Sequence, residues 1–148
     1  MSAETHYLAV FTSDKTGPKW QAWRAMSEAE QAETARIGVA AVAAWEAAHR
    51  DVIVYQGGPL GPTRRIGDDG EVTDVVNLLT VFMVVRADSH EAAARLFESH
   101  PHMSIFVCDG VEVMPVLGCV SPRRPAGSSS GQETSLRRGR ANPGCPAR

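Results

Sequence analysis

Two histidines separated by a single proline, His100 and His102, are the side chains of this sequence best suited to chemistry. An imidazole takes up and releases a proton close to neutral pH, so it serves as a general acid or base with little tuning. Side chains at positions i and i+2 of an extended segment point to the same side, which would let the pair converge on one pocket. The spacing predicts a proton-transferring site, with Asp74 as a carboxylate partner for one histidine.

A structural role is the alternative for the same pair. His100 could cap the C-terminus of the preceding helix, where the helix dipole favours a cation, and His102 could bond a loop carbonyl. The sequence leaves both interpretations open.

A metal site is not predicted. The nearest further ligands are Cys108, Asp109 and Glu112. The pair has H-x-H spacing, which matches no zinc pattern, and the chain has no second cluster of ligands. The two common glycine-rich nucleotide motifs are absent as well. Chemistry at this site is therefore expected to need no cofactor.

Several side chains are predicted to bind a small substrate. The glycines of GGPLG, with Gly58 and Pro59 at its centre, would let backbone N–H groups approach a ligand. Arginine pairs well with carboxylates, so the following arginines could hold an acid group. The alternative is a tight turn after the strand, with arginines that are only solvated. A buried amide must find a hydrogen-bond partner, in the protein or in a ligand. The remaining predicted binding residues are Arg64 and Arg65, Asn77 before a long strand, and Trp20 and Trp23 as cleft walls.

The pattern of elements predicts an α+β fold. Strands are expected in HYLAVFT, DVIVYQGG, NLLTVFMVVRA and VEVMPVLG. A capping box at Ser27 and Glu30 predicts a long helix that ends near His49, and a second helix follows Asp88 or Ser89 and stops at Pro101. The segment between strands two and three is expected to be a loop or ribbon that turns at Asp69-Gly70. The order βαββαβ is that of a ferredoxin-like protomer.

The strand composition also predicts a dimer. The helices of a ferredoxin-like protomer cover one face of the sheet, whereas the first and third strands are apolar on both faces. A second copy of the chain is the economical cover for the open face. We therefore expect a homodimer whose two sheets pack together as a dimeric α+β barrel.

The charge distribution divides the chain at residue 118. Residues 1–118 hold nine Lys and Arg against sixteen Asp and Glu, whereas residues 119–148 hold six Arg against Glu133 alone. The second segment has one Leu and no aromatic residue, so it is expected to be a disordered tail after a single domain of residues 1–118. It interleaves no aromatic residue with its arginines, which favours an inert extension over a nucleic-acid contact.

The remaining composition points to the cytoplasm. No signal peptide is recognisable at the N-terminus, and no stretch reaches the roughly 20 apolar residues that cross a bilayer. The three cysteines are widely spaced and form no CxxC pair, which is typical of reduced thiols. A soluble cytoplasmic protein without a membrane partner is expected.

The order of motifs resembles the YCII-related proteins of the dimeric α+β barrel superfamily. The similarity covers residues 6–118 and rests on the GGPLG turn, the strand NLLTVFMVV, the segment ADSHEAAARLFESHPH and the strand VEVMPVL. It implies a sheet-paired dimer with small-ligand clefts between helices and sheet, and an enzymatic role that rests on a His-Asp pair. The sequence lacks a histidine early in its first long helix and lacks an Asp-Gly-Pro-Phe motif. Such a pair would here combine His100 or His102 with Asp74 or Asp109.

Two hypotheses on function follow. In the first, the chain is a small cofactor-independent enzyme of isomerase or lyase type that acts on a small anionic or aromatic substrate. In the second, the same cleft belongs to a non-catalytic ligand-binding or regulatory dimer.

Overall fold

The computed structural model describes residues 4–118, so the predicted tail of residues 119–148 lies outside the described residues. Ten elements follow one another within residues 4–118. They are β1 (Thr5–Thr12), α1 (Pro18–Ala25), α2 (Glu28–Ala48), β2 (Ile53–Pro59), β3 (Thr63–Ile66), β4 (Val72–Val75), β5 (Leu79–Ala87), α3 (His90–Arg95), α4 (Pro101–Ser104) and β6 (Gly110–Pro115).

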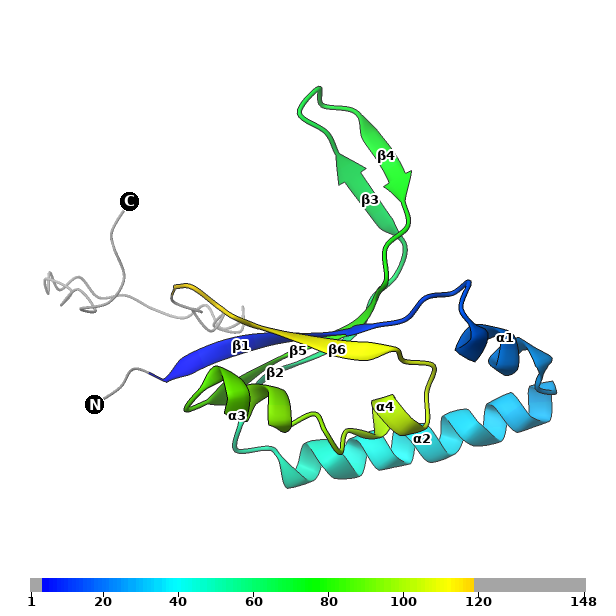
Figure 1. The fold of residues 1–148 in the computed structure, drawn as a ribbon, viewed down its shortest axis with the longest axis horizontal. Helices are drawn as coiled ribbons and strands as arrows, with labels where there is room; N and C mark the ends of the chain where they lie inside the picture. Colours follow the sequence, from blue (N-terminus) through cyan, green and yellow to red (C-terminus); the bar gives the residue numbers. More distant parts are fainter. Residues whose placement is uncertain (1–3, 119–148) are drawn as a thin grey trace, which may run out of the picture. The chain divides into compact units, whose positions relative to one another are not determined.

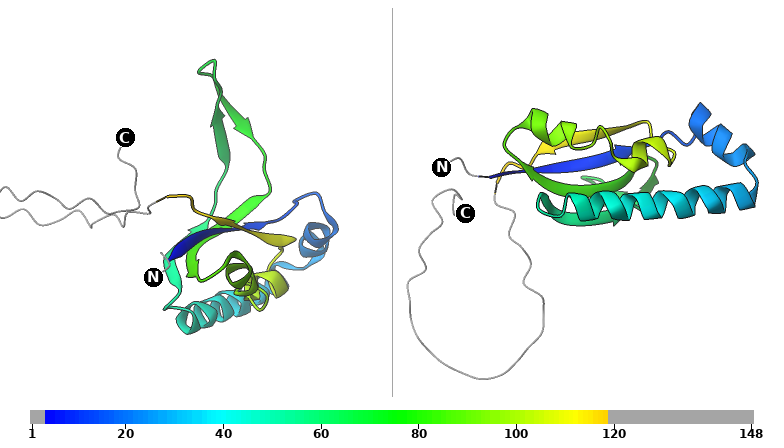
Figure 2. Two further views of the ribbon diagram at one scale, coloured as in Figure 1. Left: turned by 60° about the vertical axis from the view of Figure 1, so that its left-hand side comes forward. Right: turned by 90° about the horizontal axis from the view of Figure 1, so that it is seen from below.

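The main sheet has the ferredoxin-like strand order. Its four strands run β2-β5-β1-β6, and each neighbouring pair is antiparallel. Helix α2 connects β1 to β2, and α3 with α4 connects β5 to β6, so each half is a βαβ unit split by a strand of the other half. Figures 1 and 2 show α2, α3 and α4 on one side of this sheet. The predicted α+β class and the βαββαβ order are confirmed.

The core lies between the sheet and the helices that cover it. Alternate residues of β1 and β5 point into it, and Trp45 of α2 and Phe97 after α3 close it from the helical side. Full burial of one such large apolar side chain stabilises the fold by about 1.5–3 kcal/mol. The buried cluster comprises Tyr7, Ala9, Phe11, Trp45, Met83, Val85, Ala93, Phe97 and Cys108.

Helix α2 begins with the predicted capping box. The Ser27 hydroxyl accepts a hydrogen bond from the Glu30 backbone N–H, and the Glu30 carboxylate accepts one from the Ser27 backbone N–H. Only Gly38 and Trp45 of this helix are buried. A methyl group on Gly38 would lie 2.4 Å from the Phe106 ring, so the helix makes a close approach at that point.

The segment around the two histidines differs from the prediction. Ser89 caps α3 as predicted, but that helix ends at Arg95. Pro101 then begins the short helix α4 rather than stopping the previous one, and His100 is its N-cap. Proline is common both after the end of a helix, which it cannot continue, and in the first turn of a helix, where its missing N–H is not needed. The histidines therefore sit at a helix N-terminus and not in an extended segment.

Strand β2 continues through the predicted GGPLG turn as far as Pro59. Its register against β5 shifts between Tyr55 and Gly58, which marks a bulge. Gly57 in the bulge has φ of 66°, and a methyl group there would lie 1.9 Å from the Phe82 carbonyl oxygen. Only glycine fits this position.

Strands β3 and β4 form a separate two-stranded hairpin. This hairpin is the ribbon that was one of the two forms expected between the second and third predicted strands. Gly70 in its turn has φ of 81°. Figures 1 and 2 show the hairpin extending from the side of the main sheet opposite to the helices. Apolar side chains of this hairpin and of the chain after it are exposed, among them Ile66, Val72 and Val76.

None of the helices in residues 4–118 combines the length and the apolar character that a membrane span requires.

Candidate functional site

A cleft of about 480 Å³ lies among α2, the bulged part of β2, strand β5 and helix α4. Its lining is mainly apolar, and both histidines of the HPH segment contribute to it. The lining residues are Phe11, Val39, Val42, Ala43, Glu46, Gln56, Gly57, Gly58, Pro59, Val81, Met83, His100, His102 and Phe106. We call this space the histidine cleft.

His100 is buried, with 3% of its surface exposed, among aromatic rings. The centres of the Trp45 and Phe11 rings lie 4.3 Å and 4.8 Å from the centre of its own ring. Its Nδ1 accepts a hydrogen bond of 3.1 Å from the His102 backbone N–H, which places the proton of the neutral ring on Nε2. That Nε2 atom is buried without a hydrogen-bond partner among the described residues.

The charge state of His100 follows from the same surroundings. Burial, with smaller contributions from the positive charges of His102 and His49, lowers the pKa of His100 to about 4. His100 is therefore neutral at physiological pH. With Nδ1 engaged and Nε2 protonated, it can donate a hydrogen bond but cannot accept a proton from a substrate.

His102 lies in the first helical positions of α4 and is only partly buried. Its ring centre is 4.9 Å from that of Phe11 and 4.8 Å from that of Phe106. Burial lowers the pKa of His102, so its ring is also neutral near pH 7. Within residues 4–118 no hydrogen bond engages the ring nitrogens. One of these nitrogens is thus free to accept a proton.

A second cleft of about 210 Å³ adjoins the histidine cleft at His102. The two spaces share Val81, His102 and Phe106 as lining residues. Trp20 and Trp23 of α1 form the opposite wall. We call this space the tryptophan cleft.

Six of the ten residues predicted for the site line one of these two clefts. His100, His102, Gly58 and Pro59 line the histidine cleft, and the two tryptophans line the tryptophan cleft. Their shared location comes from tertiary packing, because they belong to α1, β2 and α4.

The other four predicted residues lie on or beside the β3–β4 hairpin. The Arg64 guanidinium pairs with the Asp74 carboxylate at 3.2 Å, because the two residues face each other in the register of the hairpin. Arg65 is exposed. Asn77 is exposed rather than buried, and its amide bonds the Thr63 hydroxyl and the Leu79 backbone N–H. None of the four lines either cleft, so Asp74 does not meet a histidine within the described protomer.

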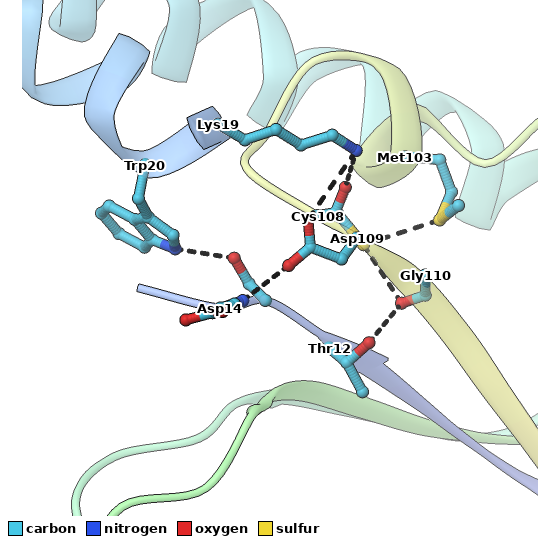
Figure 3. Close-up of polar contacts among 9 residues, drawn as sticks. Thr12, Asp14, Lys19, Trp20, Met103, Cys108, Asp109 and Gly110 are labelled. Carbon is cyan, nitrogen blue, oxygen red and sulfur yellow. Dashed lines mark hydrogen bonds and ion pairs between the residues drawn. The ribbon is translucent and has the colours of Figure 1, made fainter. Parts of the chain in front are cut away.

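Asp109, the other carboxylate considered for a His-Asp pair, is engaged elsewhere. One of its oxygens accepts a hydrogen bond of 2.6 Å from the Asp14 backbone N–H. The other lies 4.0 Å from the Lys19 ammonium (Figure 3). The Asp109 carboxylate therefore holds the chain at the end of β1 and does not orient His100 or His102.

Sequence reasoning missed two polar residues of the histidine cleft. The Gln56 amide donates a hydrogen bond of 2.6 Å to the Glu46 carboxylate, and both side chains line the cleft. Glu46 follows the buried Trp45, and Gln56 precedes the glycine pair, but neither position belongs to a recognisable motif. Only the packing of α2 beside β2 brings them together.

No three His, Cys, Asp or Glu side chains come together as a metal-binding group within residues 4–118. Cys108 is buried against Met103, and its burial raises the pKa of the thiol. A neutral buried thiol of this kind is a weak nucleophile.

The fold and these clefts define a ferredoxin-like α+β protein with a largely apolar cleft that contains two neutral histidines. No protein-family model and no curated protein matches the chain. Among solved structures it is similar to 5-chloro-2-hydroxyhydroquinone dehydrochlorinase (TftG) from Burkholderia phenoliruptrix AC1100, in a complex with 2,5-dihydroxybenzoquinone. The two sequences are 16% identical, the match covers 73% of this chain and 89% of that chain, and the TM-score is 0.43. Similarity at this level transfers neither activity nor substrate.

Proposed function

We propose that this chain is a small cofactor-independent enzyme in which His102 acts as the general base on an uncharged, planar substrate. The observation that carries the proposal is the neutral pair of histidines in an otherwise apolar cleft. His102 has a nitrogen free to accept a proton, whereas His100 offers only a donor at Nε2. In this proposal, His100 donates a hydrogen bond from Nε2 to an oxygen of the substrate.

The reaction class follows from what these groups can do. His102 removes a proton from the carbon adjacent to a carbonyl group whose oxygen accepts a hydrogen bond from His100. The electron pair of the C–H bond moves onto that oxygen, and in an isomerisation the same proton returns at another carbon. In an elimination, the electron pair of the broken C–H bond instead expels a leaving group. Neither course needs an oxidant or a metal, and a positioned base contributes about 10²–10⁴-fold to such a rate.

The lining of the clefts favours one of the two substrate types expected from the sequence, which were anionic and aromatic. No arginine or lysine of the described protomer lines either cleft, and the Glu46 carboxylate lines the histidine cleft. A bound anion would therefore meet a carboxylate and no cation in this protomer. This arrangement favours an uncharged aromatic or cyclic substrate over an anionic one.

A non-catalytic binding protein is the second candidate. The observation in its favour is that neither Asp74 nor Asp109 orients a histidine in the described protomer. A general base without a carboxylate partner is less well positioned. The same cleft would then bind a ligand and release it chemically unchanged.

We also propose that the chain forms a homodimer through the open face of its sheet. Leu8, Phe82 and Val84 alternate along β1 and β5 with residues of the buried core, so they belong to the opposite face. No helix of the described chain covers this face (Figure 2). The outward-facing apolar side chains of β1 and β5 match those of a second copy.

Deuterium exchange into candidate ligands tests the enzymatic proposal. The purified protein is incubated in D₂O with a panel of phenols, quinols and cyclic ketones, and mass spectrometry records exchange of carbon-bound hydrogen. The wild type should catalyse exchange in at least one class of compound. His102→Gln should reduce the exchange rate by about 10²-fold or more. His90→Gln, the matched control, should keep the wild-type rate. Binding of a panel member without exchange would favour the binding protein, and full activity of His102→Gln would refute the assigned base.

A further inference from the structure

Helix α1 is a loosely packed helix beside the clefts. It has eight residues and buries none of them, although two of its side chains are tryptophans. Trp20 and Trp23 are only partly buried, and the cleft that they line also contains His102. The helix is therefore not anchored in the apolar core.

Two clefts lie beside this helix. One is the tryptophan cleft, and the other, of about 280 Å³, lies between α1 and the chain around α4. Trp23 lines both of these spaces. An element with few buried apolar contacts opens at a low free-energy cost, which distinguishes α1 from the core strands.

Polar contacts hold the helix in place instead (Figure 3). The Lys19 ammonium donates a hydrogen bond of 2.6 Å to the Cys108 carbonyl oxygen and lies 4.0 Å from the Asp109 carboxylate. The Trp20 indole N–H donates to the Ser13 hydroxyl at 2.6 Å. We call Lys19 and Asp109 the latch.

The latch connects the helix to the end of the sheet. Asp109 lies directly before β6, its backbone N–H donates to the Thr12 carbonyl at the end of β1, and its carboxylate accepts from the Asp14 backbone N–H. The Lys19 and Asp109 side chains are 57% and 44% exposed. An ion pair exposed to this degree is weak and exchanges readily with water.

We infer that α1 is a movable lid over the tryptophan cleft, and that Lys19 and Asp109 are positioning residues that hold it near His102. This inference rests on the proposed function only for the identity of the molecule that the lid covers. Closure of the lid would bring the two tryptophan rings onto a planar ligand and exclude water from His102.

Two measurements without any ligand test the lid. The full-length wild type is compared with Lys19→Met, with Asp109→Asn, which keeps an oxygen for the Asp14 N–H, and with Lys15→Met as the matched control. The Lys15 side chain makes no hydrogen bond or ion pair to the described residues. Hydrogen–deuterium exchange is followed at amides 22–25 of α1 and in the middle of α2. Diethyl pyrocarbonate labelling, mapped by mass spectrometry, reports the accessibility of His102, with the exposed His90 as internal reference.

The amides of α1 should exchange about tenfold faster than those of α2 in the wild type, because α1 lacks buried contacts. Both latch variants should accelerate amide exchange in α1 and labelling of His102 several-fold. Lys15→Met should leave both rates at the wild-type value, and the labelling of His90 should be the same in all four proteins. Protection of α1 equal to that of α2, or equal His102 labelling in all four proteins, would overturn the lid. Since no substrate is involved, a failure of the enzymatic proposal would leave these outcomes unaffected.

Discussion

The backbone N–H of His102 donates a hydrogen bond to Nδ1 of His100, so the position of one histidine fixes the tautomer of the other. The two histidines, which were predicted to share one role, therefore have different ones. His100 is a hydrogen-bond donor, and His102 is the candidate base. Only His102 can carry the proton transfer, because Nδ1 of His100 is occupied and its Nε2 carries the proton.

Acid should destabilise the protein through His100. Its pKa of about 4 in the folded chain lies below its ordinary value of 6.5, so the unfolded chain binds the extra proton between these two values. Stability is then full above pH 6.5 and is lost as the pH falls towards 4, by about 3 kcal/mol at most. Urea denaturation at a series of pH values measures this loss. His100→Asn, whose amide oxygen replaces Nδ1 as the N-cap acceptor, should remove most of the pH dependence, and an unchanged slope would contradict the assignment.

Of the two adjacent glycines of β2, only Gly57 should be sensitive to replacement by alanine. A methyl group at Gly57 would overlap the Phe82 carbonyl oxygen, and its φ of 66° disfavours any other residue. Gly57→Ala should therefore lower the free energy of unfolding by about 2 kcal/mol or more. A methyl group at Gly58 meets no atom within 4 Å, so Gly58→Ala is the matched control. Equal unfolding midpoints for the two variants would contradict the bulge geometry.

Gly38→Ala should alter the cleft more than the stability. The added methyl group would press on the far end of the Phe106 ring, which lines both clefts and can rotate away. Alanine gains about 1 kcal/mol of helix propensity over glycine, which offsets part of the strain. We expect a change in unfolding free energy within about 1 kcal/mol and a shift in the NMR signals of Phe106 and His102. Unchanged signals would show that α2 and Phe106 do not meet in this way.

The open sheet face should control assembly. Val84→Lys places a charge on the face opposite to the core, where it would be buried in a sheet-paired dimer at a high cost. Sedimentation velocity should show a dimer for the wild type and a monomer for this variant. Leu117→Lys, at a 92% exposed position after β6, is the control. A monomeric wild type would refute the dimer.

Much of the fold was predictable because its signals are local. The capping box at Ser27 and Glu30 needs only neighbouring residues, and the apolar β1 and β5 strands follow from their own composition. The role of Pro101 was not predictable in the same way. Proline is favoured both after a helix and in its first turn, so the sequence could not decide whether the histidines follow one helix or begin another.

The sequence by itself determined which side chains are available for chemistry, namely two histidines, two tryptophans and a glycine turn that line adjacent clefts. Tertiary structure decided what they can do. The β3–β4 register pairs Asp74 with Arg64 away from the histidines, and the packing of α2 beside β2 places Glu46 next to Gln56 at the cleft. Burial is the main cause of the lowered pKa values of the two histidines, and it depends on neighbours that are far apart in the sequence.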